Sequence, residues 1–166
     1  MSKKLIDYVF LAVMGYILIM KAPGWIRNTS LQSKPAPIAT VKRISGENIE
    51  FPIPGQKLIV VFWATWCGPC KMELNRMNQL MSEGIIKNNE LLAISIQKDA
   101  KTVTDFMNQN NYQFLVALDE TGKIAEKYQV SGTPTVVFMD RTGKVDWITT
   151  GFSPSLSLRI KQFLKN

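Results

Sequence analysis

The 166-residue chain contains no histidine and only two cysteines. The missing imidazole excludes Ser-His-Asp and Cys-His nucleophile schemes, and it excludes every metal site that needs a histidine ligand. Two sulfurs cannot supply the roughly four ligands of a structural zinc within one chain, so only a site shared between subunits would remain. The sequence therefore predicts no metal and no cofactor.

Acidic residues are scarce at the front of the chain. Of the net charge of +7, a charge of +6 belongs to residues 1–43, which hold seven Lys or Arg and one Asp, whereas residues 44–166 carry +1. A nucleic-acid-binding domain concentrates its basic residues in the folded part. The distribution therefore argues against a nucleic-acid partner and favours a membrane surface beside the N-terminal segment.

Residues 5–20, LIDYVFLAVMGYILIM, form an apolar run that follows two lysines. About 20 residues of helix cross a bilayer core, and the run reaches that length when residues 22–26 are added, with Trp25 at the lipid interface. No small-x-small cleavage site follows Met20. We interpret residues 1–26 as an uncleaved membrane anchor that contacts lipid through residues 5–26. A cleaved secretory signal and a buried helix of the domain are the alternatives.

The anchor is followed by a predicted linker and then by one domain. Residues 27–40 are polar and include two prolines, a composition typical of a stiff connection. Residues 41–166 are expected to form the folded domain. The lysines and arginines on the two sides of the anchor do not fix its orientation, because basic residues flank it at both ends.

The domain alternates between two apolar patterns. Continuous β-branched and aromatic runs predict buried strands, and apolar residues at helical spacing predict amphipathic helices. Strands are expected at 57–65, 90–97, 113–119, 133–140 and 144–150, after a weaker hairpin around Gly46. Helices are expected after the first strand as far as Gly84, at 101–110, at 124–130, and from an N-cap at Ser153 to the C-terminus. This order predicts an α/β domain with a mixed sheet between helix layers.

Both cysteines stand in WATWCGPCK, residues 63–71, where a predicted strand gives way to a predicted helix. Unpaired backbone N–H groups and the helix dipole stabilise an anion at such a junction, so the pKa of the Cys67 thiol is expected to lie below that of free cysteine. Gly68 is expected to permit a tight turn, and Pro69 suits the first helical turn. Cys70 follows within one turn, at a separation that a disulfide tolerates.

Three interpretations of this pair are open: a redox pair, a structural disulfide and half of a metal site between subunits. A disulfide that closes so short a loop adds little entropic stability, which favours the redox pair. In that interpretation Cys67 attacks a substrate disulfide and Cys70 then displaces the substrate, leaving an internal disulfide. Run backwards, the same steps oxidise a dithiol.

WCGPCK, taken with VSGTPT at residues 130–135, resembles the thioredoxin superfamily, and the resemblance covers about residues 56–164. It implies a thioredoxin-like fold in which Cys67 is the attacking thiol and Cys70 the resolving thiol. It also implies that Pro134 is cis and faces the disulfide, and that the Thr133 backbone is free to pair with a substrate strand. Without the Cys motif, the preferred interpretation of Pro134 would be an ordinary proline at the start of a strand.

The same resemblance assigns roles to the aromatic residues of the motif. Trp66 is expected to shield the sulfurs and contact substrate, whereas Trp63 is expected in the core. The predicted substrate-binding residues are Trp66, Gly68, Pro69, Thr133 and Pro134.

Two positions resemble a narrower group, the membrane-anchored TlpA/ResA/CcmG-type proteins. Val61 occupies the position, six residues before Cys67, at which cytoplasmic thioredoxins carry a buried Asp. Glu73 stands three residues after Cys70, where this group often has an acid, and residues 88–130 resemble its extra strand-helix insertion. If partly buried, Glu73 would have a raised pKa and could move a proton to or from Cys70 as a catalytic residue. A solvated helix carboxylate is the alternative.

The resemblance implies a thiol-disulfide oxidoreductase that is anchored in the bacterial cytoplasmic membrane, with its domain facing the periplasm or cell exterior. We expect it to reduce disulfides in exported proteins, with cytochrome c maturation as one setting, and to receive electrons from a membrane donor. A disulfide oxidant or isomerase is the first alternative, and a non-catalytic docking or chaperone module is the second. The P-x-x-x-T-x-x-C signature of peroxiredoxin-type peroxidases is absent.

Overall fold

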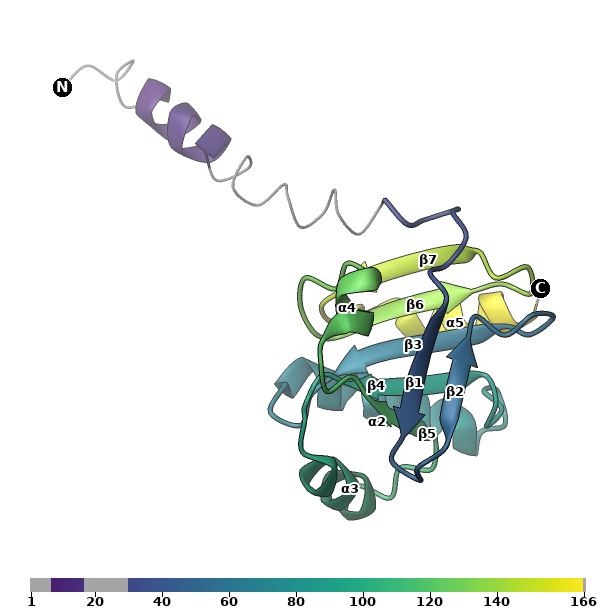
Figure 1. Ribbon diagram of the computed structural model, residues 1–166. Helices are drawn as coiled ribbons and strands as arrows, with labels where there is room; N and C mark the ends of the chain where they lie inside the picture. The colour runs from purple at the N-terminus through teal and green to yellow at the C-terminus, as the bar shows by residue number, and fades with distance from the viewer. Residues whose placement is uncertain (1–6, 17–29, 166) are drawn as a thin grey trace.

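The computed structural model describes residues 7–16 and 30–165 (Figure 1). Residues 7–16 form a helix with exposed apolar side chains, among them Phe10 and Leu11. Within these two ranges, no helix is both long enough and apolar enough to cross a membrane. The other residues of the predicted anchor, 1–6 and 17–26, lie outside the described residues.

A seven-stranded mixed sheet forms the centre of the domain, in the order β2-β1-β5-β4-β3-β6-β7 (Figure 1). Strands β3, β4 and β5 are parallel to one another, whereas β6, β7, β1 and β2 join antiparallel. The first two strands form the hairpin that the sequence predicts around Gly46. The strands are β1 (Ala39–Arg43), β2 (Asn48–Phe51), β3 (Leu58–Trp63), β4 (Leu91–Ser95), β5 (Leu115–Leu118), β6 (Thr135–Met139) and β7 (Val145–Thr150).

Helices cover both faces of this sheet. Apolar residues of three helices pack against one face, and apolar residues of the short helix α4 pack against the other, together with β1 and β2. Figure 1 shows α4 in front of the sheet and α5 behind it. The helices are α2 (Gly68–Ser82), α3 (Ala100–Gln109) and α5 (Leu156–Lys165) on the first face, and α4 (Lys123–Lys127) on the second. The predicted α/β architecture is thereby confirmed.

Strand β3 explains why the cysteine pair follows an unbroken apolar run. All six of its residues are buried. Ile59, Val61 and Trp63 belong to the core beneath α2, while Val60 and Phe62 belong to the core beneath α4. Because successive side chains of a strand point to opposite faces, a strand covered on both sides needs apolar residues at every position. The strand is therefore a rigid central element, and the residues after it start from a fixed point.

Residues 30–38 were expected in the linker, but they lie against the domain. The Ala36 N–H donates to the Gly143 carbonyl at 2.8 Å, and the Val145 N–H donates to the Lys34 carbonyl at 2.9 Å. The Leu31 side chain is buried in the same core as α4. An edge strand such as β7 presents unpaired N–H and C=O groups, which this segment satisfies. The packed domain therefore includes residues that the sequence analysis assigned to residues 27–40.

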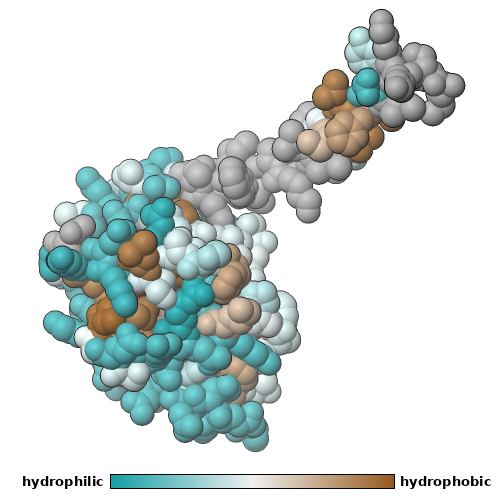
Figure 2. Space-filling view, turned by 180° about the vertical axis from the view of Figure 1, so that it is seen from behind, coloured by the Kyte–Doolittle hydropathy of each residue, from teal (hydrophilic) through white to brown (hydrophobic). Residues whose placement is uncertain are grey.

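The last helix begins later than predicted. Ser153 and Pro154 precede α5 in a turn closed by the Leu156 N–H, which donates to the Ser153 carbonyl at 3.1 Å. The Ser153 N–H is used elsewhere, in a contact with α2. Figure 2 shows the molecule from behind, where hydrophilic side chains cover most of the surface and hydrophobic ones form small separate patches.

Candidate active site

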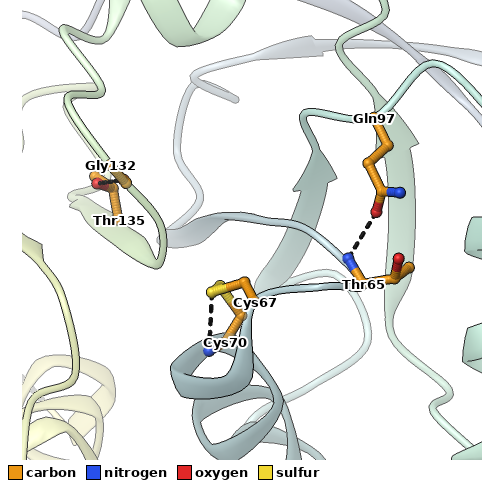
Figure 3. The surroundings of a disulfide bond; sticks show 6 residues. All are labelled: Thr65, Cys67, Cys70, Gln97, Gly132 and Thr135. Atoms are coloured by element: carbon orange, nitrogen blue, oxygen red, sulfur yellow. Dashed lines mark hydrogen bonds between the residues drawn. A yellow bond between two sulfur atoms is a disulfide. The ribbon is translucent and has the colours of Figure 1, made fainter.

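The two cysteines form a disulfide at the junction between β3 and α2 (Figure 3). Their sulfurs are 2.00 Å apart and their Cα atoms 5.2 Å apart. Cys67 is the N-cap residue of α2, and its Sγ accepts a hydrogen bond from the Cys70 N–H at 3.2 Å. The sulfur thereby receives one of the N–H groups that the start of a helix leaves unpaired. The predicted position of Cys67 at a helix N-terminus is confirmed.

The two sulfurs differ in their access to solvent. Cys67 is 5% exposed, whereas Cys70 is fully buried beneath it. Trp66 is 70% exposed, so its indole stands at the surface next to Cys67 in the chain. Trp63 is buried, with its ring centroid 5.4 Å from that of Phe106, and is a core residue as predicted. A substrate sulfur therefore meets Cys67 before Cys70.

The two residues between the cysteines, Gly68 and Pro69, suit their positions for different structural reasons. Pro69 occupies the first turn of α2, where its missing N–H costs no hydrogen bond. Gly68, which was expected to permit a tight turn, is the first residue of α2. Gly68 is not among the residues with positive φ, and a Cβ at this position would meet no atom within 4 Å. The space above Gly68 is therefore open.

Pro134 lies at the same end of the sheet as the disulfide. Thr135, the first residue of β6, pairs with Phe62 near the end of β3, so the residue before β6 and the residues after β3 share one edge. The Thr133–Pro134 peptide bond is cis, as the resemblance implied. Gly132 and Thr135 lie near the disulfide in Figure 3. Within residues 30–165, the Thr133 main chain has no hydrogen-bond partner.

Glu73 is buried, one helical turn after Cys70 on α2. Its Oε1 accepts the Ser153 N–H at 2.8 Å, and its Oε2 lies 3.2 Å from Arg76 Nη1. Burial raises the pKa of the Glu73 carboxyl above its ordinary value, although the Ser153 N–H and the Arg76 charge both oppose the rise. Of the two predicted environments, the structure shows the buried one. A carboxyl with a raised pKa can accept and return a proton.

Gln97 is a residue that the sequence analysis did not single out. Its Oε1 accepts the Thr65 N–H at 2.6 Å, across the gap between β4 and the loop that leads to Cys67 (Figure 3). The same loop is closed by the Cys67 N–H, which donates to the Ala64 carbonyl at 3.1 Å. Gln97 therefore fixes the backbone two residues before Cys67. A polar residue just beyond a buried strand, beside the strand that precedes the cysteines, is the signal that could have identified it.

Known proteins resemble this chain over most of its length. Residues 33–148 match the AhpC/TSA family. Sporulation thiol-disulfide oxidoreductase A of Bacillus subtilis is 26% identical over 166 residues, with 98% of each chain covered. Thiol-disulfide oxidoreductase ResA of Bacillus thuringiensis is 35% identical over 113 residues, which cover 68% of this chain and 65% of ResA. The crystal structure of StoA from Bacillus subtilis has a TM-score of 0.66 at 26% identity, covering 77% of this chain and 96% of StoA.

These similarities confirm the predicted resemblance at two levels. The match to StoA confirms a thioredoxin-like fold with a mixed sheet flanked by helices. The relatives named as thiol-disulfide oxidoreductases, together with the Cys67–Cys70 pair, make this chain an enzyme of the same type. Because the family match spans well over half of its residues, the chain belongs to the AhpC/TSA family, as a thioredoxin-like thiol-disulfide oxidoreductase.

Proposed function

We propose that the protein is a membrane-anchored reductase that cleaves disulfides of exported proteins outside the bacterial cytoplasmic membrane. The observation that carries the proposal is the Cys67–Cys70 disulfide at the start of α2, with one sulfur reachable and one buried. A pair so arranged can form and release a mixed disulfide without any other oxidant or reductant at the site.

The reductive reaction begins with both cysteines as thiols. The Cys67 thiolate attacks one sulfur of a substrate disulfide, forming a mixed disulfide and releasing the other substrate sulfur as a thiolate, which takes a proton. Cys70 then loses its proton to the Glu73 carboxylate and attacks the Cys67 Sγ. The Cys67–Cys70 bond forms, the bond from Cys67 to substrate breaks, and the second substrate sulfur leaves with a proton. Two electrons pass from enzyme to substrate.

Substrate contacts are assigned to the surface around Cys67. The open main chain of Thr133 would pair with an extended substrate segment, and Pro134 would hold that segment across the sulfurs. Exposed Trp66 would cover the reacting bond from the other side, with Gly68 and Pro69 leaving room between. This arrangement recognises backbone and a half-cystine, so it suits many unrelated disulfides rather than one sequence.

The reducing direction is supported by what surrounds the attacking sulfur. The two residues between the cysteines are uncharged, and the chain has no histidine that could stabilise a thiolate as an imidazolium. Lys71, the nearest cation in the sequence, lies with its Nζ 5.4 Å from the centroid of the Phe106 ring. A thiolate stabilised mainly by the helix start gives a moderately reducing pair, because a strong oxidant needs an unusually stable reduced form.

Equilibration with a redox couple of known potential tests the direction. We expect a reduction potential near that of thioredoxin, about −270 mV. A potential equal to or above that of the glutathione couple would make the protein an oxidant or isomerase and would overturn the reductase.

The anchor and its orientation form a separate part of the proposal. The described helix at residues 7–16 exposes apolar side chains, and the match to the sporulation oxidoreductase covers 98% of this chain, so it extends into residues 5–26. A reporter enzyme that is active only where disulfides form, fused after Asn166, should be active. An inactive reporter would place the domain in the cytosol.

Substrates and the electron donor can be identified with the Cys70→Ser variant. This variant cannot resolve the mixed disulfide at Cys67, so exported targets should remain covalently bound, with apocytochromes c among them. Cys67→Ser serves as the control and should retain none. Equal recovery by the two variants would favour a docking or chaperone module that uses the groove without exchange.

A further inference from the structure

The loop between β7 and α5 is held on α2 by a closed set of contacts. Glu73 Oε1 accepts the Ser153 N–H at 2.8 Å, and Arg76 Nη1 donates to the Ser153 carbonyl at 2.7 Å. Arg76 Nη1 also lies 3.2 Å from Glu73 Oε2. Arg76 therefore contacts both the Glu73 carboxylate and the Ser153 carbonyl. Glu73 and Arg76, both on α2, together bind the main-chain N–H and C=O groups of Ser153.

This set of contacts lies beside the candidate active site. Glu73 is one helical turn after Cys70, and Arg76 is one turn further. At the other end of the loop, the Gly151 N–H donates to the Pro134 carbonyl at 2.7 Å. The loop is therefore also hydrogen-bonded to the backbone at the cis proline. The contacts thus connect the buried carboxyl to both parts of the candidate site.

Solvent exposure separates the members of the set. The Glu73 side chain is 1% exposed, whereas that of Arg76 is 24% exposed. The guanidinium carbon of Arg76 lies 5.0 Å from the centroid of the Phe152 ring, and Phe152 is 41% exposed. A cation packed on an aromatic face keeps its charge while it loses part of its mobility. Arg76 is therefore fixed on its outer side by Phe152 and on its inner side by Glu73.

The charge of Arg76 lowers the pKa of the Glu73 carboxyl and so opposes the rise that burial causes. A nearby cation favours the ionised form of a carboxyl that burial would otherwise keep protonated. From α5, Arg159 turns to another partner, with its guanidinium carbon 4.3 Å from the centroid of the Trp147 ring. From α2 itself, Cys70 is held in the disulfide. The other polar contact of the Glu73 carboxyl is the uncharged Ser153 N–H.

We propose that Arg76 is a positioning residue for the resolving step, holding Glu73 ionised and oriented so that it can take the proton of Cys70. The proposal rests on the proposed role of Glu73 as proton carrier. When Cys70 gives its proton to Glu73, the Cys67–Cys70 bond forms and the bond from Cys67 to substrate breaks. Without Arg76, the Glu73 carboxyl would more often be protonated already at neutral pH and would be unable to accept that proton.

Single-turnover reaction of the reduced full-length protein with one equivalent of dithiobis(nitrobenzoate) separates the two steps. Attack by Cys67 releases the first coloured thiolate, and resolution by Cys70 releases the second. In Arg76→Met, the second release should slow by about tenfold at neutral pH, and its pH midpoint should rise by about one unit, because a nearby opposite charge shifts a pKa by at least that much. The first release should change less than about twofold, since Arg76 lies about two and a half helical turns from Cys67.

Two further variants decide between coupling and general damage to the fold. Arg76→Lys keeps the charge but not the planar fork, so it should be intermediate, and it covers the case in which Arg76→Met unfolds. Arg159→Met removes an arginine that also packs on an aromatic ring but does not contact Glu73, so it should leave the second release unchanged.

The Glu73→Gln background separates the two proposals. Arg76→Met should add nothing to the pH midpoint in that background if Arg76 acts through Glu73. If Glu73→Gln shifts the midpoint and neither Arg76 variant does, Arg76 is a structural contact only, and this inference is overturned. If Glu73→Gln itself shifts neither the rate nor the midpoint, the proton-carrier role and the role of Arg76 both fail.

Discussion

Glu73 and Asp119 are both buried carboxylates, and both accept backbone N–H groups, but they are held in different ways. Asp119, just beyond β5, accepts the Ile124 N–H at 3.2 Å and the Ala125 N–H at 2.7 Å, so both of its partners lie in the first turn of α4. Glu73 has one backbone partner, Ser153, which is 80 residues away in sequence, and one side-chain partner, the partly exposed Arg76. The first site is complete within seven residues of chain, whereas the second needs two distant elements.

The difference separates a carboxylate suited to a structural role from one suited to the proposed proton transfer. A carboxylate bound by two N–H groups of one helix start makes strong, charge-assisted hydrogen bonds to fixed partners. At Glu73, burial raises the pKa of the carboxyl, while the Ser153 N–H and the Arg76 charge oppose the rise. Burial alone does not distinguish the two carboxyls, since both side chains are buried. The proposed role of Glu73 is supported by the nature of its partners and by its place one helical turn after Cys70.

Loss of the attacking sulfur is the largest effect that we expect. Cys67→Ser should reduce disulfide reduction to the background rate, because serine cannot form the mixed disulfide. The same change opens a loop of only a few residues, so the free energy of unfolding should fall by about 2 kcal/mol or less. Insulin reduction and denaturant unfolding measure the two quantities. A variant that lost most of its stability would make the bond structural.

Removal of the other carboxylate should show the opposite pattern. Asp119→Ala leaves two N–H groups at the start of α4 without partners, which should lower the free energy of unfolding by about 2–4 kcal/mol. The rate of exchange per folded molecule should stay unchanged, because Asp119 lies on the α4 face of the sheet, away from α2. Denaturant titration and single-turnover exchange at low temperature check both parts. A slower exchange step in the folded variant would break the contrast with Glu73.

Glu73→Gln should slow the resolving step by about tenfold or more, since it removes the group that moves the proton. Its stability should respond to pH in a defined direction. Burial raises the pKa of Glu73 in the native state above its ordinary value of 4.5, so the native protein holds this proton more tightly than the unfolded chain. The stability that Glu73 contributes is therefore fully present below its ordinary pKa of 4.5, and it is lost as the pH rises through the native pKa.

Glutamine cannot ionise, so the variant should lose less stability than the parent as the pH rises. Unfolding titrations from acid to neutral pH measure the difference between the two proteins. A constant difference across this range would mean that Glu73 keeps the same charge in the native and unfolded states.

The smallest effect is expected at Gln97. Gln97→Leu leaves the Thr65 N–H without its acceptor, which should lower the free energy of unfolding by about 1 kcal/mol and slow the attack by Cys67 a few-fold.

Alkylation of the reduced protein across a pH series measures the ionisation of Cys67, whose midpoint should lie below the value of about 8.5 for free cysteine. A parent protein that ionises like free cysteine would contradict the role given to the helix start.

Local patterns in the sequence predicted most of the fold and the central part of the site. The apolar run before Cys67 predicted β3, and the proline after Gly68 predicted the start of α2, because both depend on neighbouring residues. The contact between Glu73 and Ser153 could not be predicted this way, since it joins residues that meet only after the sheet has formed. The role of Gln97 was not predicted for the same reason, because its partner Thr65 lies in the loop after a different strand, β3.

Residues 30–38 have the composition of a linker, but they contact the β6–β7 turn, the first residue of β7 and Gln129. Pro35 pairs with Lys144 as an isolated bridge, and Ser30 Oγ donates to Gln129 Oε1 at 2.5 Å. Proline at a sheet edge is compatible with such pairing, so its presence did not exclude a packed segment.

The attachment of residues 30–38 limits how far the enzyme can travel if the proposed anchor holds it. A tether of fourteen free residues, 27–40, would extend at most about 48 Å, whereas one that ends at Ser30 extends about 14 Å. The domain would then be held close to the lipid headgroups. Its substrates would be proteins that are still emerging from the bilayer or are docked on it. Its electron donor would be an integral membrane protein that needs only a short outward loop.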